Sequence, residues 1–360
     1  MNQIVLRIEE IYDYCMANHT HLICFGTGMV ARHCIQLFQH YGIWDRVRCF
    51  LDNNRKITEF LVSGKAFPVY GPEELYKKQY KKDILLILCE ASQAVLEQLE
   101  SDGSVCNCSY ILYPDINEQF IQGTLEVEKE KYQQIVETSA RVYIPQQIHT
   151  CWFGKNKMPY LHQKFIEEWK ICNPDYEIKI WNESNYDVTK CRYIQEAYES
   201  ENYAFVSDYV RMDVVYRYGG FYFDTDVEII KSLEPFRKYQ VVMAYGKWPA
   251  VNSGCGFGAR KGHPLIRKMR DNPRSYISFL DEEGKPKKVT NCYWESSVLE
   301  QEGFFMDFSS QNKDGIQILS PYYFPSAPLW KSGGGEEKMI FAKHHDQGSW
   351  KHLREHGEKE

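Results

Sequence analysis

Two aspartates end a continuous apolar and aromatic run in this chain. Asp224 and Asp226 follow directly on residues 218–223, Tyr-Gly-Gly-Phe-Tyr-Phe. In an extended strand, residues two apart point the same way, so the two carboxylates should lie side by side at the strand end. Like charges held so close either raise a pKa or share a cation. A hard divalent cation such as Mn2+ or Mg2+, with substrate phosphates completing its shell, suits such oxygen ligands; an acidic turn capping a buried strand is the alternative.

A helix predicted over residues 203–218 leads into this run. Because it is apolar around most of its girth, it should be largely buried. Asp208 and Arg211 are three residues apart and share a helix face. Buried charges must be paired and hydrogen-bonded, either by the hydroxyls of a sugar or simply by each other. Asp213 and Arg217, four apart on another side, predict an ordinary surface ion pair.

An indole lies at the end of another predicted strand, over residues 144–152. Ligands of parallel α/β sheets bind at the carboxyl ends of the strands, which is where Trp152 falls. Its ring could stack on a nucleobase, which is worth about 1–3 kcal/mol in nucleic-acid binding. Packing in the core is the alternative for this side chain.

The first 116 residues alternate strands with helices, which predicts a parallel sheet. The predicted strands are Leu22–Phe25, Val47–Leu51 and Ile84–Cys89, and the predicted helix is Val30–Tyr41. A polar segment over residues 117–141 reads as an exposed connecting helix. A second α/β domain follows over residues 142–360. The overall prediction is therefore an α/β chain whose first domain is a Rossmann-like parallel sheet.

A glycine turn follows the first of these strands. Gly26-Thr-Gly28-Met-Val-Ala matches the dinucleotide-binding pattern G-x-G-x-x-A, and Asp52 ends the next strand, where a ribose-binding acid would sit. A pyrophosphate could bind at the helix N-terminus that follows. A tight turn from strand to helix needs small residues even without a cofactor, so both interpretations stay open.

The composition narrows the class of partner. The formal net charge is −6, which gives no general attraction to nucleic acid or to an anionic membrane. A small molecule or a neutral glycan fits better. The 12 cysteines lack paired C-x-x-C spacing, which favours reduced thiols in a cytosolic protein over a zinc site. We expect neither a signal peptide nor a transmembrane segment.

Several ordered pieces together resemble a known family. Residues 204–211, Ala-Phe-Val-Ser-Asp-Tyr-Val-Arg, followed by residues 218–227, look like the DXD core of glycosyltransferase family 32. That family includes bacterial capsular polysaccharide transferases and yeast mannosyltransferases, and its core is similar to that of the large clostridial glucosylating toxins. Further matching pieces lie in residues 144–154 and 169–182. The resemblance covers about residues 142 to 350.

The resemblance implies a GT-A fold for the second domain and a nucleotide-sugar donor held by Mn2+ or Mg2+. By position, Asp226 would be the principal metal ligand, and Asp224 would contact ribose, sugar or metal-bound water. Trp152 would stack on the base. The remaining donor contacts by this resemblance would be Asp208 and Arg211 on sugar hydroxyls, and Tyr222 beside the ribose or diphosphate.

The same resemblance assigns a closing segment near the C-terminus. Within Lys-His-His-Asp-Gln-Gly-Ser-Trp, residues 343–350, His345 is favoured over His344 as a metal ligand. Ser349 and Trp350 would close over the diphosphate. A loop with Asn252 and Ser253 would lie beside the transferred sugar, or would be a plain turn between strands. Residues 290–295 depart from the family pattern, so no catalytic role is assigned to Glu295.

The function implied is that of a retaining glycosyltransferase. It would move a sugar, from a UDP-sugar by preference, to a hydroxyl of a glycan or lipid-linked glycan acceptor in surface or capsular polysaccharide synthesis. The expected location is the cytoplasm, or the periphery of the inner membrane face. Two alternatives remain: a non-catalytic nucleotide-sugar-binding subunit, and an NAD-dependent oxidoreductase acting through the glycine turn.

Overall fold

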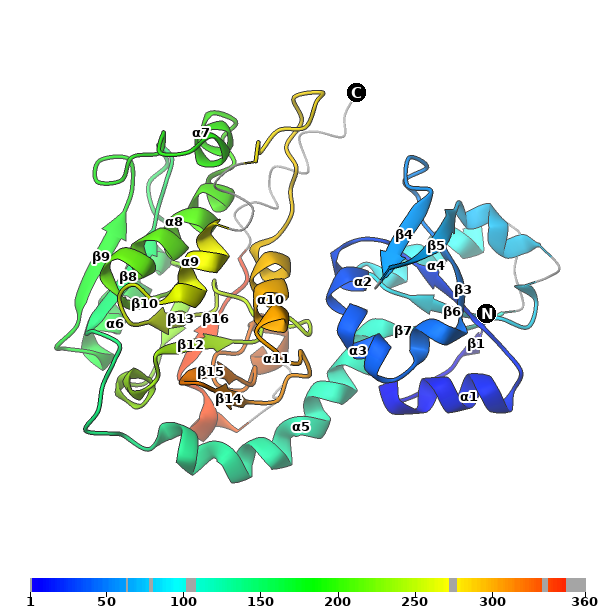
Figure 1. Cartoon of the computed structure of the whole chain (residues 1–360), viewed down its shortest axis with the longest axis horizontal. Coiled ribbons are helices and arrows are strands. Elements are labelled where there is room, and N and C mark those ends of the chain that lie inside the picture. Colours follow the sequence, from blue (N-terminus) through cyan, green and yellow to red (C-terminus); the bar gives the residue numbers. More distant parts are fainter. Residues whose placement is uncertain are drawn as a thin grey trace. The chain divides into compact units, whose positions relative to one another are not determined.

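The structure is a computed structural model that describes residues 2–62, 64–77, 80–101, 108–271, 277–331 and 336–347 (Figure 1). It divides into two compact units. The first holds the chain up to Thr124 together with Phe305–Asp307, and the second holds the rest. Each unit has its own sheet, so each is described separately.

The first unit is built on a seven-stranded sheet in the order β1-β7-β6-β2-β3-β5-β4. Every pairing is parallel except the one between β4 and β5. The strands are β1 (Asn2–Gln3), β2 (Leu22–Phe25), β3 (Val47–Leu51), β4 (Glu59–Val62), β5 (Lys65–Tyr70), β6 (Ile84–Ile87) and β7 (Ser109–Leu112). The helices are α1 (Ile11–Ala17), α2 (Met29–His33), α3 (Ile35–His40) and α4 (Ser92–Ser101).

This topology confirms the α/β fold class and the predicted parallel sheet. Strands β2 and β3 have the predicted bounds. All four residues of β2 and four of the five residues of β3 are buried, in keeping with their apolar sequences. The single helix predicted over 30–41 is instead two short helices that meet at Cys34. The connecting segment 117–141 lies largely within α5 (Tyr113–Val136), which runs from the first unit into the second.

The second unit contains a mixed seven-stranded sheet in the order β14-β15-β12-β13-β10-β8-β9 and a two-stranded sheet of β11 and β16. Strand β10 is central, parallel to β8 and antiparallel to β13. The strands are β8 (Gln147–Cys151), β9 (Glu177–Trp181), β10 (Gly220–Tyr222), β11 (Val227–Ile229), β12 (Val241–Ala244), β13 (Phe257–Ala259), β14 (Gln311–Lys313), β15 (Ile316–Leu319) and β16 (Ala342–His344).

Helices cover this sheet (Figure 1). Helix α8 (Tyr203–Tyr218) packs against β8, β10 and β13 and against its neighbours α7 and α9. Helix α6 (Tyr160–Cys172) packs on β11. The remaining helices are α7 (Arg192–Glu199), α9 (Pro264–Asp271), α10 (Asn291–Gln301) and α11 (Ala327–Lys331). A mixed sheet with parallel neighbours and flanking helices is consistent with a GT-A-like α/β arrangement.

Helix α8 has the predicted bounds and is buried along most of its length. It ends at Gly219, whose φ of 74° is costly for a residue with a Cβ, and whose N–H donates to the Val215 carbonyl. Gly220 also has a positive φ of 99°, and a Cβ there would lie 2.7 Å from the Gln147 carbonyl oxygen. The two glycines therefore let the chain turn directly from α8 into β10, which carries the aspartates.

The predicted ion pair between Asp213 and Arg217 on α8 is present, but its position at the surface is wrong. Asp213 is fully buried, and its carboxylate accepts hydrogen bonds from Tyr186 Oη at 2.8 Å and Lys190 Nζ at 2.5 Å. Arg270 also contacts it at 3.0 Å, whereas Arg217 lies 3.5 Å away. Asp213 is thus an internal anchor for the elements around α8, because several donors outside the helix converge on it.

His149 on β8 gives the second unit a pH-dependent stability. Its Nε2 lies 2.8 Å from the Gly219 carbonyl oxygen, while Trp181 Nε1 donates to its Nδ1 at 3.3 Å. Burial lowers the pKa of the ring from its usual 6.5 to about 4. The neutral ring therefore stabilises the fold above the unfolded pKa, and that contribution is lost as pH falls from about 6.5 to 4.

We expect protonation of His149 to lower the free energy of unfolding by up to about 3 kcal/mol as pH falls through that range, since one pKa unit is worth about 1.4 kcal/mol. Urea denaturation of the wild type and of His149→Asn between pH 4 and 8 measures it. The variant should be less stable at pH 7, and its stability should fall less steeply with acid. The exposed His19→Asn is the control and should keep the wild-type slope. Parallel slopes for wild type and His149→Asn would contradict the assignment.

No described helix has the length and apolar character needed to cross a bilayer. The eleven cysteines whose positions are described all carry free thiols.

Candidate metal and donor site

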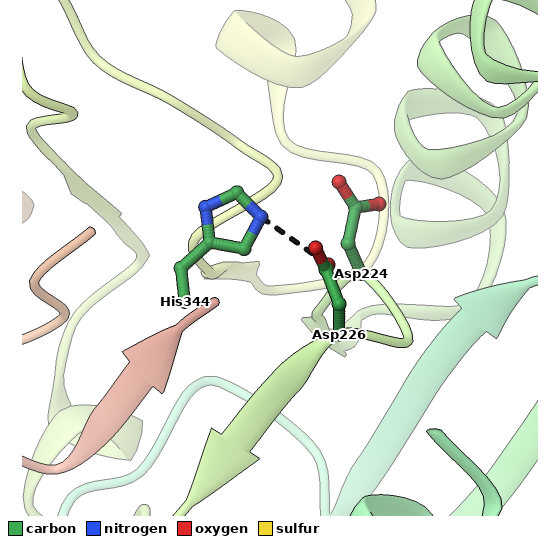
Figure 2. Close-up of side chains that lie close together, drawn as sticks. All are labelled: Asp224, Asp226 and His344. Atoms are coloured by element: carbon green, nitrogen blue, oxygen red, sulfur yellow. Dashed lines mark ion pairs between the residues drawn. The ribbon is translucent and has the colours of Figure 1, made fainter. Parts of the chain in front are cut away.

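Two aspartates and one histidine converge beyond the carboxyl end of β10 (Figure 2). Asp224 follows β10, Asp226 immediately precedes β11, and His344 ends β16. Each offers a ligand atom, and these three atoms all lie within 4.8 Å of one another. Carboxylate oxygens and an imidazole nitrogen are a donor set that Mn2+ accepts. The chemistry and spacing of the three side chains therefore fit a divalent cation.

The pairing of β11 with β16 selects the histidine. Val227 is the register partner of His344, which brings His344 Nε2 to 3.2 Å from Asp226 Oδ1 (Figure 2). Successive side chains of an extended segment point to opposite faces, so His345 turns away, and its Nε2 lies 3.2 Å from Glu228 Oε2. The prediction of His345 is therefore corrected: the histidine that lies beside the two aspartates is His344.

Asp226 is held in the ionised form. Burial by itself opposes ionisation, but hydrogen bonding and charge from His344 and a bond from the Gln347 N–H outweigh it and lower the pKa of Asp226 well below its usual range. The Gln347 N–H donates to Asp226 Oδ2 at 3.0 Å, and the His345 N–H donates to the Asp226 carbonyl oxygen at 3.1 Å. The carboxylate is thus ready to accept a cation.

Asp224 is the more accessible of the pair, with 28% of its side chain exposed against 12% for Asp226. Arg211 Nη2 donates to its Oδ1 at 3.0 Å, and Tyr222 Oη donates to the same oxygen at 2.8 Å. Its Oδ2 is held less closely, with Arg211 Nη2 at 3.4 Å. The site is therefore approached from the side of Asp224.

Arg211 links Asp224 to a buried polar network. Its guanidinium contacts Asp208 Oδ1 at 3.1 Å and donates from Nη1 to Ser253 Oγ at 3.2 Å. Ser253 Oγ donates in turn to Glu295 Oε1 at 2.8 Å, and the Asn291 amide donates to Ser253 Oγ at 2.8 Å. These contacts fix the guanidinium plane, so Arg211 can orient Asp224.

This network changes three roles expected from the family resemblance. Tyr222 and Ser253 have no exposed surface, so they act on Asp224 and Arg211 and do not line a donor cavity. Arg211 is 4% exposed and already surrounded by acceptors, which leaves it a positioning role. Glu295, at 1% exposure, is part of the same scaffold.

Gly254 leaves room for the Asp224 carboxylate. A Cβ at this position would lie 2.4 Å from Asp224 Oδ2 and 3.1 Å from Asn252 Oδ1. The Asp224 N–H also donates to the Gly254 carbonyl oxygen at 3.1 Å. Asp224 would have to rotate away from Arg211 and Tyr222 to admit a methyl group.

We therefore expect Gly254→Ala to lower turnover by about 100-fold, the cost of misplacing a reacting group by about 1 Å, with a small loss of stability. Steady-state rates and thermal unfolding of the purified variant measure the two effects. Gly123→Ala in α5, where a Cβ meets nothing within 4 Å, is the matched control. Full activity of Gly254→Ala would show that Asp224 need not keep this position.

His162, which the sequence analysis missed, connects Trp152 with the aspartate loop, residues 223–226 between β10 and β11. The partly buried indole donates from Nε1 to the Asn156 carbonyl oxygen and packs edge-to-face on His162. His162 Nδ1 lies 2.9 Å from Thr225 Oγ1, between the two aspartates, and its Nε2 lies 2.9 Å from Gln347 Oε1. His162 therefore connects the indole, the aspartate loop and the C-terminal segment.

Of the other residues expected to contact the donor, the structure describes Asn252 but not Ser349 or Trp350. Asn252 is partly buried, and its Oδ1 accepts a hydrogen bond from the Gly254 N–H at 2.9 Å, so it shapes the loop beside Asp224. Ser349 and Trp350 lie outside the described residues.

The glycine turn of the first unit uses its acid internally. Asp52 Oδ2 accepts hydrogen bonds from the N–H and hydroxyl of Thr27 at 2.9 and 2.6 Å, and its Oδ1 accepts from the Asn54 N–H at 2.8 Å. Gly26 has a φ of 104°, and a Cβ there would lie 2.9 Å from the Leu88 carbonyl oxygen. Gly28 precedes a helix of only five residues. The tight turn by itself explains why residue 26 is a glycine, and the hydrogen bonds that Asp52 accepts within the turn explain the aspartate.

Part of the sequence is similar to known glycosyltransferases. Residues 159–243 match the family described as glycosyltransferase sugar-binding region containing DXD motif. Asp224-Thr225-Asp226 is the only Asp-x-Asp in that range. The chain is 30% identical over 149 residues to inositol phosphoceramide mannosyltransferase 3 of Schizosaccharomyces pombe, covering 38% of this chain and 39% of that protein. The chain thus spans about two fifths of the length of this curated relative.

Among solved structures, the PaToxG glycosyltransferase superposes with a TM-score of 0.38 at 18% identity, over 52% of this chain and 79% of that one. This likeness is too low to support a conclusion about fold or function. The sequence match, however, runs from the start of α6 into β12 and contains both aspartates of the candidate site. The second unit therefore contains a region similar to the sugar-binding region of DXD-containing glycosyltransferases.

Proposed function

We propose that the second unit is a metal-dependent glycosyltransferase that uses a nucleoside-diphosphate sugar as donor. One observation carries the proposal: Asp224, Asp226 and His344 come within 4.8 Å of one another, and both aspartates lie in the segment that matches a DXD sugar-binding region. A turn that only caps a strand would not require a histidine beside its carboxylates, whereas β16 places His344 there from more than 100 residues downstream.

The cation in this proposal is Mn2+ or Mg2+, with Asp226 and His344 as its firmest ligands and Asp224 as a direct or water-mediated partner. When bound, it would neutralise charge that develops on the departing diphosphate. The protein's own part is to hold these carboxylates in position. Arg211 and Tyr222 donate hydrogen bonds to Asp224, and the Gln347 N–H donates one to Asp226.

We assign the nucleobase to the partly buried indole of Trp152, because this residue directly follows β8 and connects through His162 to the aspartate loop. Asp208 remains a candidate partner for sugar hydroxyls, since 11% of its side chain is exposed at the edge of the network. Ser349 and Trp350 would close over the diphosphate, as the family resemblance implies. A UDP-sugar is the first choice of donor.

The stereochemical proposal is retention. The carboxylates nearest the site are already engaged: Asp208 and Asp224 with Arg211, and Glu295 with Ser253. None is free to act as a covalent nucleophile, which favours attack on the same face as the leaving diphosphate, with the leaving phosphate accepting the proton of the acceptor hydroxyl.

The acceptor is proposed to be a glycan or a lipid-linked glycan in surface or capsular polysaccharide synthesis, at a cytoplasmic or peripheral inner-membrane location. A lipid-linked acceptor is supported by the relative, whose name is inositol phosphoceramide mannosyltransferase 3. The same name favours a mannosyl donor as the second candidate. Donor tests should therefore include GDP-mannose beside the UDP-sugars.

A thermal-shift screen of nucleotide sugars with and without Mn2+ tests the proposal. One donor should raise the unfolding temperature, and the rise should disappear without metal. Donor binding without hydrolysis or transfer across a broad acceptor panel would instead identify a non-catalytic nucleotide-sugar-binding subunit. A shift with NAD alone, lost on changing Gly26 or Gly28, would identify an oxidoreductase and overturn the proposal.

A further inference from the structure

A carboxylate stands behind the candidate metal-binding histidine. Asp346 Oδ1 lies 2.9 Å from His344 Nδ1, on the side of the ring away from Asp226. The Asp346 carboxylate is partly buried, with 28% of the side chain exposed. We infer that Asp346 is a positioning residue: it fixes the orientation and tautomer of His344 so that Nε2 is presented to a divalent cation. This inference rests on the proposed metal-dependent function.

The hydrogen-bond chemistry of the pair gives the tautomer. An ionised carboxylate can only accept, so Nδ1 carries the proton of the bond to Asp346. Nε2 faces Asp226 at 3.2 Å and donates to that carboxylate while no cation is bound; a cation that binds there would replace the Nε2 proton and take up the lone pair. A histidine that binds a metal through one nitrogen commonly donates from the other to a carboxylate, which orients the ring and makes it a better ligand.

The Asp346 carboxylate is itself held in place. Its Oδ2 accepts a hydrogen bond from the Ala327 N–H at 3.1 Å, where α11 begins. Its other oxygen is therefore left to His344. Asp346 has a φ of 51°, a left-handed conformation that Asp, Asn and Gly tolerate best, and this turn brings the side chain back beneath the ring only two residues after it.

The backbone of His344 is also held by hydrogen bonds. The rotation of its ring is therefore the motion that the contact with Asp346 restricts. The His344 N–H donates to the Pro325 carbonyl oxygen at 2.9 Å, and Trp330 Nε1 donates to the His344 carbonyl oxygen at 3.1 Å. Cys255 Sγ, 3.3 Å from Nδ1, completes the surroundings of that nitrogen. Without Asp346, the thiol would be the remaining partner and a much weaker one.

The neighbouring histidine supplies a matched control. His345 Nε2 contacts Glu228 Oε2 at 3.2 Å, so Glu228→Gln removes one carboxylate beside a histidine in the same strand pair without touching the His344 ring. Asp346→Asn keeps a side-chain acceptor and the left-handed backbone but removes the charge. Asp346→Gly keeps the backbone conformation and removes the side chain altogether.

The experiment measures Mn2+ affinity of the full-length protein by calorimetry and by electron paramagnetic resonance, without any donor. Asp346→Gly should weaken Mn2+ binding by about 10- to 100-fold, Asp346→Asn less, and Glu228→Gln by less than about 2-fold. The nitrogen coupling of an imidazole ligand in the Mn2+ spectrum should weaken in Asp346→Gly. In a His344→Gln background the effect of Asp346→Gly should vanish, because the two residues act through one contact.

Three outcomes would overturn the inference: wild-type affinity in both Asp346 variants, an equal loss in Glu228→Gln, or an undiminished effect of Asp346→Gly when His344 is absent. If Asp346→Gly fails to fold, the comparison of Asp346→Asn with Glu228→Gln decides. Wild-type protein that binds no Mn2+ would remove the proposed function as well. Normal Mn2+ binding that is indifferent to Asp346 would remove only this inference.

Discussion

Asp226→Asn should lower the rate of sugar transfer by about 1,000-fold or more while the protein stays folded. The carboxylate is largely buried and held ionised, so it is the firmest anionic ligand of the candidate metal site. A metal ion supplies several kcal/mol of charge stabilisation, and each 1.4 kcal/mol is tenfold in rate. Initial rates at increasing Mn2+ concentration, with the donor found by thermal shift, measure the loss.

Asp224→Asn is the matched comparison. Asp224 is more exposed and keeps its hydrogen bonds to Arg211 and Tyr222 through one oxygen, so an amide can retain part of this arrangement. We expect a smaller loss than for Asp226→Asn, with some recovery at high Mn2+. Normal metal-dependent turnover of Asp226→Asn would refute the proposed role of the pair.

Arg211→Met should destabilise the second unit by about 3 kcal/mol and abolish donor binding. The guanidinium is 5% exposed and lies between Asp208 and Asp224, at 3.1 and 3.0 Å. Removing one partner from a buried charge group leaves uncompensated charge, which costs about 3–5 kcal/mol. The lower value applies because Asp224 is partly solvated. Urea denaturation and the donor thermal shift measure both effects.

Arg217→Met is the control on the same helix. Arg217 is about half exposed and stands 3.5 Å from Asp213, which keeps Lys190 and Arg270 as partners. Its loss should cost less than about 1 kcal/mol, as for exposed ion pairs. Arg211→Lys should fall between the two, since lysine restores the charge without the planar fork. Equal stability of the two methionine variants would rule out the central role of Arg211.

Elements that depend on local sequence could be predicted well. Helix α8 and the strands β2 and β3 have the bounds that their apolar runs and flanking residues indicated. The position of Asp224 after a central strand, and its contact with Tyr222 two residues earlier, also follow from the period of an extended chain. These features need no knowledge of distant partners.

The errors concern contacts between segments far apart in the chain. His344 and His345 are equally plausible in the sequence, and only the register of β16 on β11 decides which one faces Asp226. The four-residue spacing predicted the ion pair between Asp213 and Arg217, but it did not predict that Asp213 is buried or that Lys190 and Arg270 contact it from other elements. His162 had no sequence signal at all, since its partners are 63 and 185 residues away.

The assigned donor contacts illustrate a further limit of sequence reasoning. Family resemblance places Tyr222, Ser253 and Arg211 around the donor, but it does not say which side chains are exposed. The structure shows all three buried in a hydrogen-bonded scaffold around Asp224. A motif can therefore identify a site correctly while leaving open which residues contact the substrate and which position the ones that do.

The most direct measurement of the central claim is a crystal structure of the protein soaked with Mn2+ and UDP, with anomalous scattering used to locate the metal. The account predicts one manganese peak within ligand distance of Asp226 and His344 Nε2, with Asp224 reached directly or through a water and the diphosphate on its open side. A manganese peak at His345, or no peak beside Asp226 although UDP is bound, would contradict it.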